Sequence, residues 1–154
     1  MTQIIDRLHS VIVNAPRLPG DMVVYRGVDD RYRNLKPGDT VTDVGFNSTS
    51  ADGPSAAMYT IQGTWDELKH PEMGQYMLTF KQSPMPPCCL FEIELPKGTP
   101  ALWFESEQEV LLDKGRQYMV TNVESKEVPV DLSFYSRSSR LPVIMQVVRM
   151  RLIN

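Results

Sequence analysis

The segment at residues 89–95 carries the pattern that most constrains the fold, because its apolar residues alternate with Glu92 and Glu94 before Pro96 and Gly98 end it. A period of two places successive side chains on opposite faces, which is typical of a β-strand with one buried face. Residues 22–27 form a β-branched and aromatic run, which predicts a second, buried strand. The chain is therefore expected to build a sheet.

Short strands dominate the rest of the chain. Residues 3–13 place apolar side chains three and four positions apart, which predicts an amphipathic helix, and a proline begins a small helix predicted at residues 54–59. Residues 61–87 lack a clear period and are interpreted as mostly loop. Further strands are expected at residues 44–50, 109–112, 117–123 and 143–152. This pattern predicts a single α+β domain over residues 1–154, built on packed sheets.

Composition narrows the possible functions. The chain has 154 residues, of which 42% are hydrophobic, enough for one sizeable core. A net charge of -3 and a pI near 5.4 argue against a protein that mainly grips phosphate backbones, so no nucleic-acid partner is expected. Cys88 and Cys89 are adjacent and cannot join distant parts of the chain to each other. We therefore expect no disulfide framework and a reducing compartment.

Targeting signals are absent from the sequence pattern. Residues 1–16 never form an apolar run of signal-peptide length. No stretch approaches the roughly 18 to 20 apolar residues of a membrane-spanning helix. We expect no membrane association, and either a cytoplasmic protein or one delivered into a host cytoplasm by a machinery that reads no such signal.

Two polar features follow predicted strands or lie in them. Arg26 ends an apolar strand and precedes Gly27, which lets a ligand approach the backbone closely. A guanidinium there can hold a phosphate, although such an arginine more often pairs with a surface carboxylate. In a strand, Ser48 and Ser50 face one side and Thr49 the other, so two hydroxyls could orient groups in a cleft. Alone, this triplet is more often a turn or a helix cap.

The third feature is an acidic pair, Glu107 and Glu109. If a strand begins near Glu107, both carboxylates lie on one face and point toward the same volume. Like charges persist there when a cation or an electron-poor reaction centre occupies the space between them, whereas the plainer interpretation is a solvated strand start. His9 and His70 have no partners at metal-ligand spacing, so no metal site is predicted.

Joint occurrence of the three features is more specific than any one of them. Arg26-Gly27, then Ser48-Thr49-Ser50, then Glu107-Gln108-Glu109 resembles the Arg, Ser-Thr-Ser and Glu-x-Glu signature of arginine-directed mono-ADP-ribosyltransferases, which include bacterial exotoxins and bacteriophage-encoded enzymes. Phe104 stands where that family has an aromatic residue before its two glutamates. The resemblance covers about residues 23–123 and implies two packed, strongly bent sheets with NAD⁺ in the cleft between them.

The resemblance also implies a role for each motif residue. Arg26 would hold the pyrophosphate of NAD⁺, and the backbone of Gly27 would receive the nicotinamide amide. Ser48 would hydrogen-bond the catalytic carboxylate of Glu109, which would accept a hydrogen bond from the 2′-hydroxyl of the nicotinamide ribose. Breaking the nicotinamide glycosidic bond develops positive charge on that ribose, which a fixed carboxylate stabilises.

The remaining motif residues would complete the site. Thr49, Ser50 and Phe104 would support the cofactor cleft. A guanidinium acceptor is a poor nucleophile until a base draws off a proton, and Glu107 is suited to that role. Relatives that modify other acceptors commonly have glutamine at this position, so Glu107 favours arginine of a protein partner as the acceptor, with free guanidino compounds as an open alternative.

Other interpretations remain open on the same residues. The toxins usually carry a second pyrophosphate arginine after Ser-Thr-Ser, yet residues 51–114 contain no arginine, and Lys69, His70 and Lys81 are the candidates to replace it. An NAD⁺ glycohydrolase would use water in place of the acceptor. A catalytically inactive binding or structural module could keep the same fold. Transfer to a nucleobase is disfavoured by the pI and by Glu107.

Overall fold

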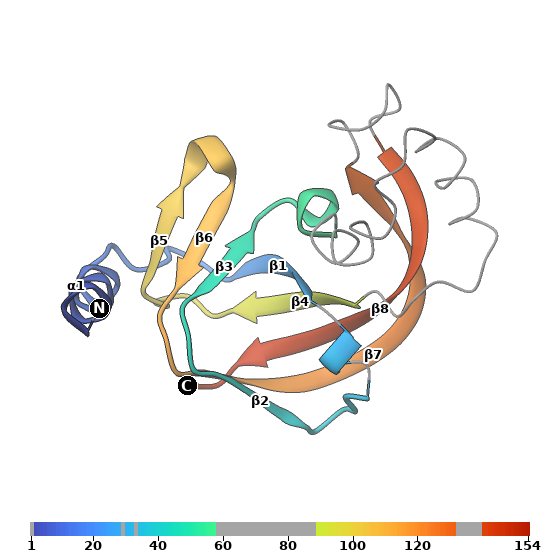
Figure 1. The fold of residues 1–154 in the computed structure, drawn as a ribbon, viewed down its shortest axis with the longest axis horizontal. Coiled ribbons are helices and arrows are strands. Elements are labelled where there is room, and N and C mark those ends of the chain that lie inside the picture. The colour runs from blue at the N-terminus through green and yellow to red at the C-terminus, as the bar shows by residue number, and fades with distance from the viewer. Residues whose placement is uncertain (1, 29, 33, 58–88, 132–139) are drawn as a thin grey trace.

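The computed structural model describes residues 2–28, 30–32, 34–57, 89–131 and 140–154. A helical turn covers residues 53–57. The other elements are, in chain order, α1 (Thr2–Val13), β1 (Met22–Val28), η1 (Asp30–Tyr32), β2 (Thr40–Asp43), β3 (Asn47–Ser50), β4 (Cys89–Leu95), β5 (Ala101–Phe104), η3 (Glu105–Glu107), β6 (Glu109–Leu112), β7 (Arg116–Asp131) and β8 (Arg140–Leu152) (Figure 1). The predicted α+β class is confirmed. In these residues no helix is long and apolar enough to cross a membrane.

The eight strands pair in the order β2-β7-β8-β4-β1-β3-β6-β5. Neighbouring strands are antiparallel except β4 and β8, which are parallel. Strand β1 pairs with β4 along its whole length, but β1 and β3 share one registered pair, Tyr25 with Ser50. This narrow junction divides the order into two bent parts, β2-β7-β8-β4-β1 and β3-β6-β5 (Figure 1). The two predicted sheets are thus joined at one point.

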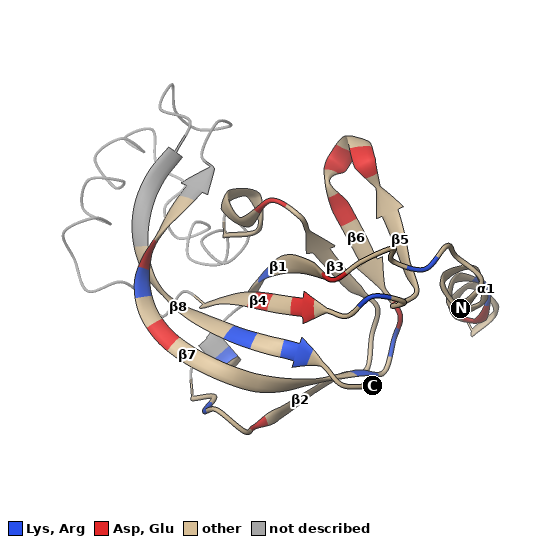
Figure 2. Cartoon of the chain, turned by 180° about the vertical axis from the view of Figure 1, so that it is seen from behind, with Lys and Arg blue, Asp and Glu red and all other residues tan. Residues whose placement is uncertain are grey.

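Both parts contribute to one hydrophobic core. Val24 of β1, Ile93 of β4 and Val148 of β8 pack in the same buried cluster as Val110 and Leu112 of β6. In β4 the predicted alternation holds from Phe91 to Leu95, where the apolar residues are buried and the two glutamates between them are more exposed, whereas Leu90, on the same face as the glutamates, is also buried. Figure 2 shows these acidic residues of β4 beside basic residues of β8 on the outer face. The core therefore fixes which face of each strand meets solvent.

Several predicted boundaries differ from the structure. Strand β3 begins at Asn47 and not at residue 44, because the backbone N–H of Gly45 donates to the Asp43 side chain and turns the chain there. Strands β2 and β5 were not predicted, since each has four residues and a single buried one. Strand β7 continues to Asp131 because its polar half pairs with β8. The predicted loop at 61–87 lies outside the described residues.

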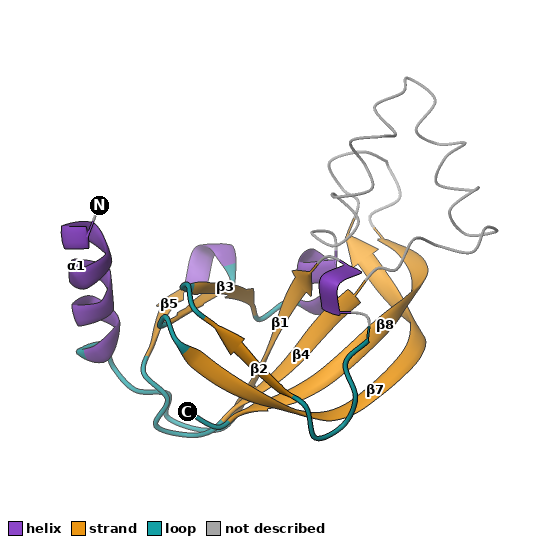
Figure 3. Cartoon of the chain, turned by 60° about the horizontal axis from the view of Figure 1, so that its bottom comes forward, coloured by secondary structure: helices purple, strands orange, loops and turns teal. Residues whose placement is uncertain are grey.

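Helix α1 lies at the end of the sheet, beside the β5 side of the domain (Figure 3). Its Ile12 is fully buried. His9 Nδ1 lies 2.7 and 2.9 Å from the two carboxylate oxygens of Asp113. Asp113 is itself buried and directly follows β6. The polar contact thus ties the helix to the residue that directly follows the strand beginning with Glu109.

Replacing Ile93 with alanine should lower the free energy of unfolding by about 2–5 kcal/mol, because the side chain is fully buried and the substitution leaves a cavity. Ile144→Ala is the matched control, since Ile144 is 60% exposed and its loss should change stability by no more than about 0.5 kcal/mol. Denaturant unfolding of both variants measures the difference. Equal losses would contradict this placement of the core.

Candidate active site

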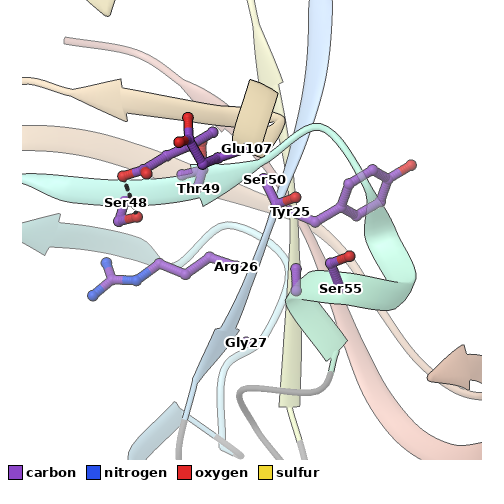
Figure 4. Close-up of a pocket in the computed structure, with 10 residues that line it drawn as sticks. Tyr25, Arg26, Gly27, Ser48, Thr49, Ser50, Ser55 and Glu107 are labelled. Carbon is purple, nitrogen blue, oxygen red and sulfur yellow. Dashed lines mark hydrogen bonds between the residues drawn. The ribbon is translucent and has the colours of Figure 1, made fainter. Parts of the chain in front are cut away.

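Strands β3 and β6 bring Ser48 to Glu109. Their antiparallel register pairs Ser50 with Glu109 and Ser48 with Leu111, so these side chains share one face. Glu109 lies diagonally opposite Ser48, within reach of a long side chain. The Ser48 hydroxyl donates to Glu109 Oε1 at 2.8 Å (Figure 4). The hydroxyl therefore holds one carboxylate oxygen, and Oε2 makes no hydrogen bond to the residues that the structure describes.

Thr49 faces the opposite side of β3, as the period of two predicts. It is 3% exposed, and its hydroxyl donates to the backbone carbonyl of Val110 at 2.7 Å. This bond satisfies a buried polar group and fastens β3 to β6. On the other face, the hydroxyl of Ser50 accepts a hydrogen bond from the backbone N–H of Asp52 at 3.0 Å. The triplet thus serves both the sheet and the site.

Glu107 reaches the site by a different route from the predicted one. Strand β6 begins at Glu109, so Glu107 is not on the strand but is the last residue of η3. Between them, Gln108 has φ 53° and ψ 29°, a left-handed conformation that is uncommon for residues other than glycine. The backbone N–H of Gln108 donates to the carbonyl of Glu105 at 3.2 Å and closes this turn. The turn, and not a shared strand face, brings the two glutamates together.

Arg26 is held by residues of the β2–β3 region that sequence reasoning missed. Its Nη1 donates to the carboxylate of Asp43 and to the side-chain oxygen of Asn47. The Asn47 amide in turn donates to the Tyr118 hydroxyl at 2.9 Å. Asn47 and Tyr118 are 1% and 2% exposed, so this hydrogen-bond chain is buried. Only the position of Asn47 directly before Ser48 hinted at a role in the sequence.

These elements enclose a pocket of about 390 Å³ where β1 and β3 part (Figure 4). Figure 4 shows the Arg26 side chain extending from β1 toward the end of the pocket where Ser48 lies on β3. The pocket is lined by Tyr25, Arg26, Gly27, Ser48, Thr49, Ser50, Ser55, Ala56, Glu107 and Glu109. Phe104 is the predicted site residue that does not line it, and its side chain is 43% exposed at the end of β5. The predicted replacements Lys69, His70 and Lys81 lie outside the described residues.

Burial keeps the hydroxyl of Tyr118 protonated. Desolvation raises the pKa of Tyr118 from 10.0 to about 12, and the negative charge of Asp43 adds to the rise. The hydrogen bond from Asn47 and the nearby cations Arg116 and Arg26 lower the pKa in opposition. The Tyr118 hydroxyl therefore stays protonated at neutral pH and remains a neutral partner for Asn47.

Comparison with known proteins identifies this arrangement of strands. The sequence matches no protein-family model and no curated protein. Among solved structures, it is similar to Plx2a, an ADP-ribosyltransferase toxin from Paenibacillus larvae, with 15% identity over 99% of this chain and 70% of that one and a TM-score of 0.59. It is also similar to the Vis toxin, an ADP-ribosyltransferase from Vibrio splendidus, with 19% identity over 99% of this chain and 57% of that one and a TM-score of 0.60.

A third similar structure is the ADP-ribosylating toxin BECa of a binary enterotoxin of C. perfringens, determined with NADH. The identity is 16%, the TM-score is 0.59, and the match covers 97% of this chain and 34% of BECa. This chain thus spans about a third of BECa and a little over half of Vis. At such identities the likeness shows the fold, which is that of the ADP-ribosyltransferase toxins.

The free energy of unfolding should fall less with rising alkaline pH in the Tyr118→Phe variant than in the wild-type protein. Below pH 10 the phenol is neutral in both folded and unfolded chains. Between pH 10 and 12 it ionises first in the unfolded chain, since its folded-state pKa is raised to about 12, so the wild-type protein loses stability there. Over this interval the variant should lose roughly 2 kcal/mol less than wild type in denaturant unfolding. Parallel losses in the two proteins would contradict the buried phenol.

Proposed function

We propose that the protein is a mono-ADP-ribosyltransferase that uses NAD⁺ as its substrate and modifies an arginine of an acceptor protein. The observation that carries the proposal is the 2.8 Å hydrogen bond from Ser48 to Glu109, in a pocket that Arg26 also lines. A carboxylate, a hydroxyl that orients it and a guanidinium suit a substrate with an electron-poor ribose and a diphosphate.

Glu109 stabilises the bond-breaking step. The bond between nicotinamide and ribose breaks, its electron pair leaves with nicotinamide, and positive charge develops on the ribose. Ser48 holds Glu109 Oε1, so the carboxylate enters the reaction already oriented. Its Oε2 accepts a hydrogen bond from the 2′-hydroxyl of the same ribose. The catalytic contribution of Glu109 thus depends on Ser48.

The other pocket residues bind the dinucleotide. Arg26 pairs with the diphosphate through charge-assisted hydrogen bonds. Gly27 follows it in the pocket wall, where its backbone receives the nicotinamide amide. Ser50 and Thr49 shape the opposite wall on β3. The solved structure of BECa with NADH supports a dinucleotide ligand for this fold.

Glu107 acts on the acceptor. A guanidine nitrogen attacks the ribose carbon that nicotinamide leaves, a carbon–nitrogen bond forms, and the nitrogen gives its proton to the Glu107 carboxylate. Glu107 is exposed at the pocket, where an arginine of another protein can reach it. Figure 2 shows acidic residues at the tip of the β5–β6 hairpin, which favours a cationic acceptor. Two of the similar structures are bacterial toxins, which supports an effector role. The acceptor protein would then lie in a host cytoplasm.

Substitution of the two glutamates should separate cleavage from transfer. Glu109→Gln should reduce both NAD⁺ cleavage and protein labelling by at least about a hundredfold, because it removes the charge that stabilises the ribose cation. Glu107→Gln should abolish labelling and leave some NAD⁺ hydrolysis. Labelled NAD⁺ incubated with host lysate, followed by mass spectrometry of modified residues, measures both effects and identifies the acceptor.

Three outcomes would contradict parts of the proposal. Equal labelling by wild type and Glu109→Gln would show that Glu109 is not the catalytic carboxylate. Equal loss of hydrolysis in both variants would remove the division of roles between the two glutamates. NAD⁺ cleavage by wild type without any labelled protein would identify a glycohydrolase instead of a transferase.

A further inference from the structure

Among the described residues, the contacts of Arg26 come from one of its three nitrogen atoms. Its hydrogen bonds to Asp43 and to Asn47 both start from Nη1. Within the part of the chain that the structure describes, Nε and Nη2 make no hydrogen bond. A guanidinium binds an oxyanion with two parallel hydrogen bonds from one edge. The edge formed by Nε and Nη2 is therefore the one left for an anionic ligand.

Asn47, one of the two partners of Nη1, is buried and is itself held by a hydrogen bond. Asn47 lies on the buried face of β3, one residue before Ser48 on the pocket face. Its amide donates to the hydroxyl of Tyr118 on β7 at 2.9 Å. Hydrogen bonds therefore link β7, β3 and β1 in series, from Tyr118 through Asn47 to Arg26. A neutral buried amide can orient a guanidinium in this way without cancelling its charge.

A second guanidinium shares the carboxylate that holds Arg26. Arg116 lies opposite Asp43 in the β2–β7 register, and its buried Nε has no hydrogen-bond partner among the described residues. The positive charges of Arg26 and Arg116 lower the pKa of the Tyr118 hydroxyl, whereas the negative charge of Asp43 raises it. Because Asp43 faces two guanidinium groups, it does not cancel the charge of Arg26 alone, and Arg26 can still attract an anionic ligand.

We propose that Asn47 and Tyr118 are positioning residues that, with Asp43, fix Nη1 of Arg26 so that its Nε–Nη2 edge receives the diphosphate of the dinucleotide. This inference rests on the proposed function for the identity of the ligand. Neither residue touches the ligand, and each acts through the orientation of Arg26. The consequence is that a phenol on β7 controls cofactor affinity and not the bond-breaking step at Glu109.

Binding of ADP tests the proposal separately from catalysis, because ADP carries the diphosphate but lacks the ribose that contacts Glu109. Tyr118→Phe removes the hydroxyl that holds Asn47 and keeps the ring. It should weaken ADP binding, measured by calorimetry, between about threefold and tenfold, the effect of one lost hydrogen bond. In NAD⁺ cleavage it should raise KM by a similar factor and leave kcat within about twofold.

A double-mutant cycle shows whether Tyr118 acts through Arg26. In an Arg26→Lys background the guanidinium is gone, so adding Tyr118→Phe should change ADP affinity by less than about twofold. Tyr32→Phe is the matched control, since it also removes a phenol hydroxyl while its ring stacks edge-on against Phe91 at 5.0 Å. ADP affinity should stay at the wild-type level in this control. Asn47→Asp, which adds a second carboxylate to Arg26, should weaken ADP binding at least about tenfold.

The possible outcomes separate the two proposals. Wild-type affinity in Tyr118→Phe or Asn47→Asp, or an equal loss from Tyr118→Phe in both backgrounds, would overturn the positioning role and leave the proposed function intact. A wild-type protein that binds neither ADP nor NAD⁺ would overturn both. Loss of NAD⁺ cleavage in Glu109→Gln with unchanged ADP affinity would support the proposed function alone, whichever way the cycle comes out.

Discussion

The single registered pair between β1 and β3 is the constraint on which the pocket depends. Tyr25 and Ser50 hold the two strands together at one point, and beyond it the strands part. A continuous ladder between β1 and β3 would pair Gly27, which already pairs with β4, with β3 as well and would close the space beside it. Because pairing stops, Arg26 and Gly27 on one side and Ser48 on the other face a common volume. The site is thus a local interruption of an otherwise continuous sheet.

Strand β3 is short, yet side chains on both of its faces form hydrogen bonds. On the buried face, Asn47 and Thr49 form hydrogen bonds to Tyr118 and to the Val110 carbonyl. On the pocket face, Ser48 holds Glu109. The buried bonds fix the backbone that carries the exposed hydroxyl, so the carboxylate is oriented by a rigid element and not by a loop. This division of roles follows directly from the period of two.

Local patterns in the sequence predicted the strands with clear alternation and the facing of Ser48, Thr49 and Ser50. They failed where the structure depends on distant or unusual features. No local pattern indicates that Gln108 adopts a left-handed conformation, so Glu107 was expected on the strand. The Asn47–Tyr118 bond joins residues 71 positions apart, and such a contact exists only once the sheet has formed. The plainer interpretation of Arg26, pairing with a carboxylate, proved correct in part, because Asp43 does hold it.

The register between β3 and β6 also limits how a chain like this can diverge. Inserting or deleting one residue within either strand would reverse the facing of every side chain beyond it and would separate Ser48 from Glu109. Changes of length are tolerated in the connections, where they leave this pairing untouched. The placement of Ser48 beside Glu109 therefore depends on the lengths of two four-residue strands and not on the identity of most other residues.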